Sequence, residues 1–238
     1  MKKIWVIKTG QTFPLAAKRF GDFEQWIFSG AHPQHNFERN TTAAFLDQAL
    51  PAPSQIDAVI ITGSPAMVTD CSPWMEQLAD WLRHIVAANI PVLGICFGHQ
   101  ILAHALGGVV GYHPGGRELG TVGVTLLPCA KEDPIFKNLP NDFSAHVSHK
   151  QTVLTLPLNA VHLACNDFES HHAFRVGSCA WGLQFHPEFT EEIMKEYIDY
   201  FSGHLEGEGL DKSLLLSKIS KTPASAKVLE NFFTWVLG

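Results

Sequence analysis

A cysteine between two glycines is the residue of this sequence best suited to act as a nucleophile. Cys96 lies in Gly94-Ile95-Cys96-Phe97-Gly98, after an apolar strand pattern and before a helical one. A nucleophile on such a turn is exposed at the carboxyl end of a sheet, and small residues two positions away on either side let the backbone pass closely. The N-terminus of the following helix favours the reactive thiolate. The pattern therefore predicts a catalytic Cys96 rather than a structural cysteine in a turn.

A histidine and a glutamate two residues apart are candidates for the base and its orienting group. The apolar run 181–185 ends in His186-Pro187-Glu188. Residues two apart in an extended segment project to the same side, so Glu188 can bond one ring nitrogen of His186. That bond fixes the tautomer and leaves the other nitrogen for a nucleophile. We therefore predict a catalytic triad of Cys96, His186 and Glu188.

The other histidines and cysteines are expected to be structural. The chain has 13 histidines, and the pair His171-His172 is expected at a partly exposed strand end. No group of them has the spacing of a metal site, so no metal is predicted. The cysteines number five, and they fit neither zinc motifs nor a disulfide framework. Free thiols favour a reducing, cytoplasmic setting.

Composition and charge exclude several classes of protein. Hydrophobic residues make up 46% of the 238, enough for a sizeable core, and the net charge of −6 argues against nucleic-acid binding. The apolar run at the N-terminus ends at Lys8, too early for a signal peptide, and no run approaches the length of a membrane span. We expect a soluble protein with neither a nucleic-acid nor a membrane partner.

Short apolar runs alternating with helical patterns predict a doubly wound parallel sheet in the first half. The predicted strands are 4–7, 58–61 and 90–95, and the predicted helices are 41–50, 73–88 and 98–106. Ser72 and Pro73 are a typical N-cap and first helical residue. Residues 11–40 give no clear period and are expected to be irregular, with one edge strand at most.

The second half predicts strands linked by short turns, some of them antiparallel. They are expected at 121–127, 143–148, 160–165, 172–176 and 180–185. A helix over 190–201, a glycine-rich loop over 203–209 and an amphipathic helix over 224–236 should follow. Residues 1–238 are predicted to form a single domain with a helical segment over about 190–238. Phe232, Phe233 and Trp235 are expected to pack internally, with a docking face for a partner as the alternative.

The two catalytic stretches together resemble the class I (triad) glutamine amidotransferases. G-I-C-F-G-H-Q is similar to the cysteine elbow of that family, and G-L-Q-F-H-P-E is similar to its histidine–glutamate block. The resemblance covers roughly residues 55–190 and is nearest to the amidotransferase domain of GMP synthase and its stand-alone relatives. It implies a flavodoxin-like three-layer α/β sandwich with a central mostly parallel sheet, an additional small antiparallel sheet, and no cofactor.

The resemblance also implies roles for residues around the triad. Thr62-Gly63-Ser64-Pro65 is similar to a loop that supplies half of an oxyanion hole, so the N–H groups of Gly63 and Phe97 are the expected donors. Arg117-Glu118-Leu119-Gly120 resembles a segment that flanks the glutamine pocket. The residues expected to bind the substrate are Gln100, Ser148 and His149.

Three functions are compatible with this pattern. The first is a glutamine amidotransferase that forms a cysteinyl thioester and passes ammonia to a separate synthase subunit. The second is a stand-alone γ-glutamyl peptidase or hydrolase with the same triad, and the third is a non-enzymatic regulatory or binding module. Ser148-His149-Lys150-Gln151 departs from the Ser-His-Gly-Asp of GMP synthases, and the mostly helical last 50 residues are too few for an ATP-using synthetase domain.

Overall fold

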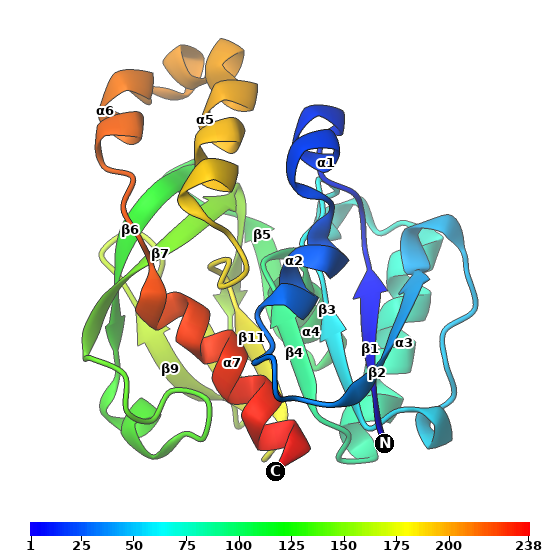
Figure 1. The fold of residues 1–238 in the computed structure, drawn as a ribbon. Helices are drawn as coiled ribbons and strands as arrows, with labels where there is room; N and C mark the ends of the chain where they lie inside the picture. Colours follow the sequence, from blue (N-terminus) through cyan, green and yellow to red (C-terminus); the bar gives the residue numbers. More distant parts are fainter.

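A nine-stranded mixed sheet forms the centre of the protein, drawn for residues 1–238 of a computed structural model in Figure 1. Its members are β1 (Lys2–Lys8), β2 (Phe37–Ala43), β3 (Ala58–Ile61), β4 (Val92–Ile95), β6 (Glu118–Leu126), β7 (Asp142–His149), β9 (Val161–Cys165), β10 (Ala173–Val176) and β11 (Ala180–Leu183). They are ordered β2-β1-β3-β4-β11-β10-β9-β6-β7. A separate two-stranded sheet pairs β5 (Val109–Tyr112) with β8 (Gln151–Thr155).

The main sheet changes from parallel to antiparallel pairing at β11. Strands β2, β1, β3, β4 and β11 are all parallel neighbours, whereas β10, β9, β6 and β7 continue the sheet with antiparallel pairs. β4 lies between β3 and β11, with Leu183 in register with Ile95. Because the carboxyl ends of parallel strands meet at one edge, the residues that follow these three strands are brought together.

Helices cover both faces of the sheet and complete three layers. They are α1 (Pro14–Phe20), α2 (Phe23–Ser29), α3 (Pro73–Ala87), α4 (Phe97–Ala105), α5 (Glu191–Leu205), α6 (Lys212–Ser217) and α7 (Pro223–Leu237). Figure 1 shows α2 and α7 in front of the sheet and α3 and α4 behind it. α5 and α6 stand together beyond β6 and β7, at the end toward which the parallel strands point.

Separate apolar clusters pack on the two faces. The side chains of α3 and α4 pack with one face of β1, β3 and β4, and those of α2 and α7 pack with the other face. Phe232 and Phe233 are fully buried within the second cluster, so the prediction that they pack internally is confirmed. Trp235 is 38% exposed and lies edge-on to the buried Trp181. A smaller third cluster joins α5 to α2 and Leu119.

Most strands and the longer helices lie where the sequence predicts them, and three segments differ. The helix predicted over 41–50 is wrong, because Thr41 and Thr42 pair with β1 as part of β2 and only a short 3₁₀ turn follows over Ala44–Leu46. The irregular region predicted over 11–40 contains α1 and α2 before the edge strand β2. The loop predicted over 203–209 is instead the end of α5 and a 3₁₀ turn, η5 (Glu206–Glu208).

The positions of two strands and a helix were not predicted, because β5, β8 and α6 are four to six residues long and have no distinct period. β5 and β8 nevertheless form the small antiparallel sheet that the family resemblance implies, and α6 lies within the segment expected to be helical. No helix of the protein combines the length and apolar character needed to cross a bilayer.

Candidate active site

Cys96 sits on a tight turn between β4 and α4. Its backbone has φ 53° and ψ −102°, a positive φ that residues other than glycine adopt rarely. A Cβ on Gly94 would lie 2.3 Å from the carbonyl oxygen of Gly98, and a Cβ on Gly98 would lie 2.4 Å from that of Ile61. Both glycines are therefore required by close backbone approach, and the strained turn holds the sulfur at the carboxyl edge of the sheet.

Hydrogen bonds tie this turn to the strands on both sides. The Cys96 N–H donates to the Leu183 carbonyl at 2.7 Å, and the Gly98 N–H donates to the Thr62 carbonyl at 3.1 Å. The Cys96 side chain is nearly buried and its thiol lies 3.7 Å from the Ser148 carbonyl. The turn that carries the sulfur is thus tied to β11 and to the residue after β3, and the thiol itself contacts the end of β7.

His186 and Glu188 form a buried pair directly after β11. His186 Nδ1 lies 2.7 Å from Glu188 Oε1, and the other Glu188 oxygen is buried with no partner. The His186 ring stacks on Phe189 at 4.0 Å, and its backbone N–H bonds the His146 carbonyl at 2.8 Å. The Glu188 carboxylate thus contacts only the Nδ1 nitrogen of His186, and stacking on Phe189 holds the plane of the imidazole ring.

The charges around His186 favour its protonated form. Burial alone lowers the pKa of this imidazole, but attraction to Glu188 and to Cys96, together with hydrogen bonding to both, raises it to about 10. An imidazolium next to a cysteine favours the thiolate. The arrangement is able to store a proton on His186 and to release it to a leaving group.

A cavity of about 390 Å³ opens beside Cys96 and His186. The predicted residues Phe97, Gln100, Ser148 and His149 line it, as do residues that the sequence did not single out. Those residues are Gln11, Thr12, Phe13 and Pro14 before and at the start of α1, Ala66 and Met67 after β3, and Tyr197, Tyr200 and Phe201 of α5. Ser64 and Pro65, from the loop predicted to supply half of the oxyanion hole, line the cavity as well. Residues 11–14 carry no periodic or motif signal, so nothing in the sequence could have placed them at the site.

The loop after β3 approaches the histidine. A Cβ on Gly63 would lie 3.1 Å from His186 Cε1, so this glycine allows the ring to approach. The Gly63 carbonyl accepts hydrogen bonds from the Thr9 and Thr62 hydroxyls and is thereby oriented. Gly63 itself does not line the cavity, whereas Ser64 does. The peptide that joins these two residues is thus fixed next to the triad.

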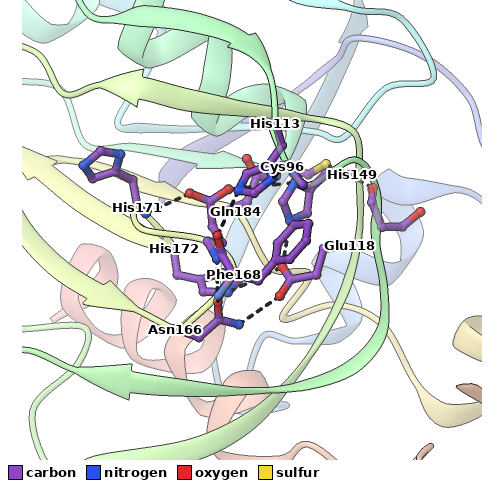
Figure 2. Close-up of polar contacts among 12 residues, drawn as sticks. Cys96, His113, Glu118, His149, Asn166, Phe168, His171, His172 and Gln184 are labelled. Carbon is purple, nitrogen blue, oxygen red and sulfur yellow. Dashed lines mark hydrogen bonds and ion pairs between the residues drawn. The ribbon is translucent and has the colours of Figure 1, made fainter. Parts of the chain in front are cut away.

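A buried polar network supports the wall formed by His149 (Figure 2). His149 Nε2 lies 2.9 Å from Glu118 Oε2, and its Nδ1 lies 3.0 Å from the Gln151 carbonyl. Asn166 donates to the second Glu118 oxygen at 2.9 Å. Both nitrogens of the His149 ring are therefore engaged inside the protein, which leaves its main chain to face the cavity. Gln100 donates to the Gln151 carbonyl and to Gln184 Oε1.

His172 belongs to the same network, although the sequence suggested a partly exposed strand end. It is fully buried, and its Nε2 lies 3.6 Å from Glu118 Oε2. Burial lowers the pKa of His172 to about 4 in spite of this carboxylate. The prediction of partial exposure was wrong for His172, which directly precedes β10, an interior strand paired on both sides, whereas His171 is partly exposed as predicted.

A carboxylate from outside the core reaches two cations at the cavity. Glu208, in η5, lies 2.6 Å from Arg117 Nε and 2.5 Å from Lys150 Nζ. The hydrogen bond from Arg117 lowers the pKa of Glu208 to about 2, and Lys150 acts in the same direction against the effect of burial. Glu208 is therefore ionised at neutral pH. The Arg117 guanidinium also stacks 4.0 Å above the Phe201 ring.

Comparison with known proteins assigns the family. The family model "Glutamine amidotransferase class-I" matches residues 33–201. This chain is a class I glutamine amidotransferase family member. Within the family, it is 32% identical over 149 residues to a subunit of GMP synthase (glutamine-hydrolyzing) from Methanocaldococcus jannaschii, a match that covers 60% of this chain and 73% of that protein.

Other relatives match over a smaller share of their length. Gamma-glutamyl peptidase 3 of Arabidopsis thaliana is 30% identical, over 60% of this chain and 59% of that protein. GMP synthase (glutamine-hydrolyzing) of Thermosipho africanus is 35% identical, over 59% of this chain but 27% of that protein. The matched part of this amidotransferase family member thus spans about a quarter of that GMP synthase and over half of the peptidase.

Solved structures confirm the predicted fold class. A glutamine amidotransferase from Thermotoga maritima superimposes with a TM-score of 0.79 at 22% identity, covering 100% of this chain and 99% of that one. A second, from Methylobacillus flagellatus, gives 0.78 at 21% identity and covers 100% of this chain and 96% of that one. This chain, an α/β sandwich with a mixed main sheet and an added two-stranded sheet, therefore shares the fold of these proteins.

Proposed function

We propose that this protein hydrolyses the side-chain amide of glutamine, with Cys96, His186 and Glu188 as its catalytic triad. The observation that carries the proposal is the meeting of Cys96 and the His186–Glu188 pair at one sheet edge, beside a cavity. Each of the three follows from adjacent strand ends, because β4 and β11 are parallel neighbours. The family assignment supports the same chemistry.

The proposed reaction proceeds through a thioester. The Cys96 thiolate attacks the amide carbon, and the bond between that carbon and nitrogen breaks as the His186 imidazolium gives its proton to the departing ammonia. His186 then takes a proton from water, whose oxygen attacks the thioester and releases glutamate and the Cys96 thiolate. Glu188 holds the ring in one orientation through both halves.

The developing oxyanion needs donors near the sulfur. We propose the Phe97 N–H, at the start of α4, and an N–H of the Gly63–Ser64 segment for this role. Gly63 is the residue that the sequence indicates, and the cavity lining adds Ser64 to the candidates. Gln100, Ser148 and His149 remain the proposed substrate contacts, with the ring of His149 acting from behind the wall.

A second candidate is the hydrolysis of a γ-glutamyl conjugate, and the observation that favours it is the similarity to gamma-glutamyl peptidases 3 and 5 of Arabidopsis thaliana. It requires the same thioester and differs only in the amine that leaves. The similarity to single subunits of GMP synthase favours the first candidate, with ammonia passed to a separate synthase chain.

Product analysis separates these candidates. Purified protein is incubated with glutamine or with γ-glutamylglycine, and ammonia, glycine and glutamate are quantified. Ammonia from glutamine supports the amidotransferase, and preferred release of glycine supports the peptidase. The Cys96→Ala variant should lose either activity by several orders of magnitude. Normal turnover by this variant would contradict both.

A further inference from the structure

The cavity beside Cys96 has positive side chains in its wall and no negative ones. Apart from the proposed catalytic pair Cys96 and His186, its charged lining residues are Arg117 and Lys150, and neither aspartate nor glutamate is among them. Arg117 is almost completely buried, and Lys150 is about one-third exposed. Such a wall favours an anion, since a cation of this kind is costly to bury without a partner.

Arg117 and Lys150 are paired with the carboxylate of Glu208, which does not line the cavity beside Cys96. Glu208 Oε2 accepts a hydrogen bond from Arg117 Nε, and Oε1 contacts Lys150 Nζ and also accepts from Arg117 Nη2 at 3.5 Å. Glu208 lines a second cavity, of about 210 Å³, whose wall also includes Arg117 and Lys150. The two cations therefore separate a cavity that contains the reactive cysteine from one that contains a protein carboxylate.

The segment that carries Glu208 is attached in a way that lets its carboxylate withdraw. Glu208 lies between Gly207 and Gly209, and a Cβ on either glycine would touch nothing. The arm formed by α5, η5 and α6 (residues 191–217) lies beyond the sheet in Figure 1. A separate exposed ion pair, Lys212 to Asp199 at 2.7 Å, joins α6 to α5 within this arm. If Glu208 lost its contacts with Arg117 and Lys150, α6 would thus still be joined to α5 by this ion pair.

We propose that Arg117 and Lys150 form a carboxylate-binding subsite of the active site and that Glu208 occupies it as an internal competitor until a substrate carboxylate displaces it. The subsite rests on the proposed function, because a γ-glutamyl substrate carries such a group. Arg117 and Lys150 line the same cavity as Cys96, so a carboxylate a few bonds from the attacked carbon is placed to meet them. A subsite of this kind selects amino-acid amides over simple amides.

Paired variants test the subsite through the separation of KM from kcat. The substrates are γ-glutamylglycine, which has a carboxylate on the glutamyl part and on the leaving part, and γ-glutamylmethylamide, which has the first only. Arg117→Gln is expected to raise KM roughly 10- to 100-fold with little change in kcat, because it removes ground-state binding. Lys150→Met should act in the same direction. Glu208→Gln is expected to lower KM about threefold or more, because it removes the competitor.

The matched control is Asp199→Asn, which removes the neighbouring ion pair of the same arm and should leave both constants unchanged. Equal effects on both substrates assign the subsite to the glutamyl carboxylate, and effects confined to γ-glutamylglycine assign it to the carboxylate of the leaving group. An unchanged KM in both Arg117→Gln and Lys150→Met, with melting temperatures equal to wild type, overturns the proposal. So does a Glu208→Gln variant with a raised KM.

A binding experiment tests the subsite even if the proposed hydrolytic function is wrong. If wild type hydrolyses neither substrate, calorimetric titration of glutarate into wild type and Glu208→Gln still decides the subsite. Tighter binding by Glu208→Gln supports it, and equal affinity overturns it.

Discussion

His186 is an imidazole placed between a carboxylate and a thiol in a buried site. Burial alone would keep it neutral, but Glu188 and Cys96 outweigh that effect. In the proposed reaction, the residue is therefore prepared to donate a proton in the first half. The spacing of His186 and Glu188 in the sequence was enough to predict their contact, and the glycines around Cys96 were enough to predict the turn. Arg117, Lys150 and Glu208 could not be assembled from sequence, because their meeting depends on how α5 ends.

The raised pKa of His186 predicts where activity declines at high pH. Its imidazolium form persists up to about pH 10, so kcat/KM should fall only as pH rises through that value. The Glu188→Gln variant removes a negative charge that raises this pKa, so its decline should move to lower pH. The measurement is kcat/KM for glutamine from about pH 6 to about pH 10.5 in both proteins. An identical alkaline limb in the variant would show that Glu188 does not hold the proton on His186.

At the scale of elements, the site is made by strand order. β4 lies between β3 and β11, so the proposed nucleophile Cys96, His186 and the loop after β3 share one edge although they come from distant parts of the chain. These strands could be predicted from the sequence, because strands that are buried on both faces form continuous apolar runs. The helix predicted over 41–50 failed because pairing of β2 with β1 overrides local preference. Helices α1 and α2 have seven residues each and left no clear period.

The close contact between α4 and β3 predicts a cost for any side chain at Gly98. The Gly98→Ala variant places a Cβ 2.4 Å from the Ile61 carbonyl oxygen, so the free energy of unfolding should fall by about 2 kcal/mol or more. Urea denaturation measures it. The control is Gly203→Ala in α5, where a Cβ would touch nothing and the change should stabilise by roughly 0.5–1 kcal/mol. Equal stability of the two variants would contradict the tight packing of the elbow.

At the scale of the whole molecule, two histidines are buried in the sheet close to the residues that form the cavity wall. His146 and His172 are both fully inaccessible, and burial lowers the pKa of each to about 4. Glu118 shows the complementary behaviour: burial acts to raise its pKa, but the hydrogen bond from His149 and the neighbouring histidine charges lower it. The sequence contains 13 histidines, and it does not indicate which of them are buried. The burial of His146 and His172 follows from the antiparallel extension of the sheet.

These groups predict a loss of stability in mild acid. Between pH 6.5 and about 4, the unfolded chain binds protons at His146 and His172 that the folded protein excludes, so the free energy of unfolding falls as pH falls. A pKa difference from 6.5 to about 4, at about 1.4 kcal/mol per unit, makes this on the order of 3 kcal/mol per histidine by pH 4. The lowered pKa of Glu118 adds to the loss below its ordinary value.

Urea unfolding at about pH 7.5, 6.0 and 5.0 measures this decline. The His172→Met variant should flatten it, whereas His84→Gln, at an exposed position of α3, should not. A decline of the same steepness in wild type and His172→Met would contradict the role of this buried histidine.

The most direct test of the central claim is intact-protein mass spectrometry after exposure to 6-diazo-5-oxo-norleucine, a glutamine-like electrophile. Cys71 and Cys129 are exposed free thiols and serve as internal controls for nonspecific labelling. We predict one adduct, located on Cys96, prevented by excess glutamine and missing in Cys96→Ser. Labelling of Cys71 or Cys129 instead, or labelling of Cys96 that glutamine does not reduce, would contradict a glutamine-directed nucleophile at this position.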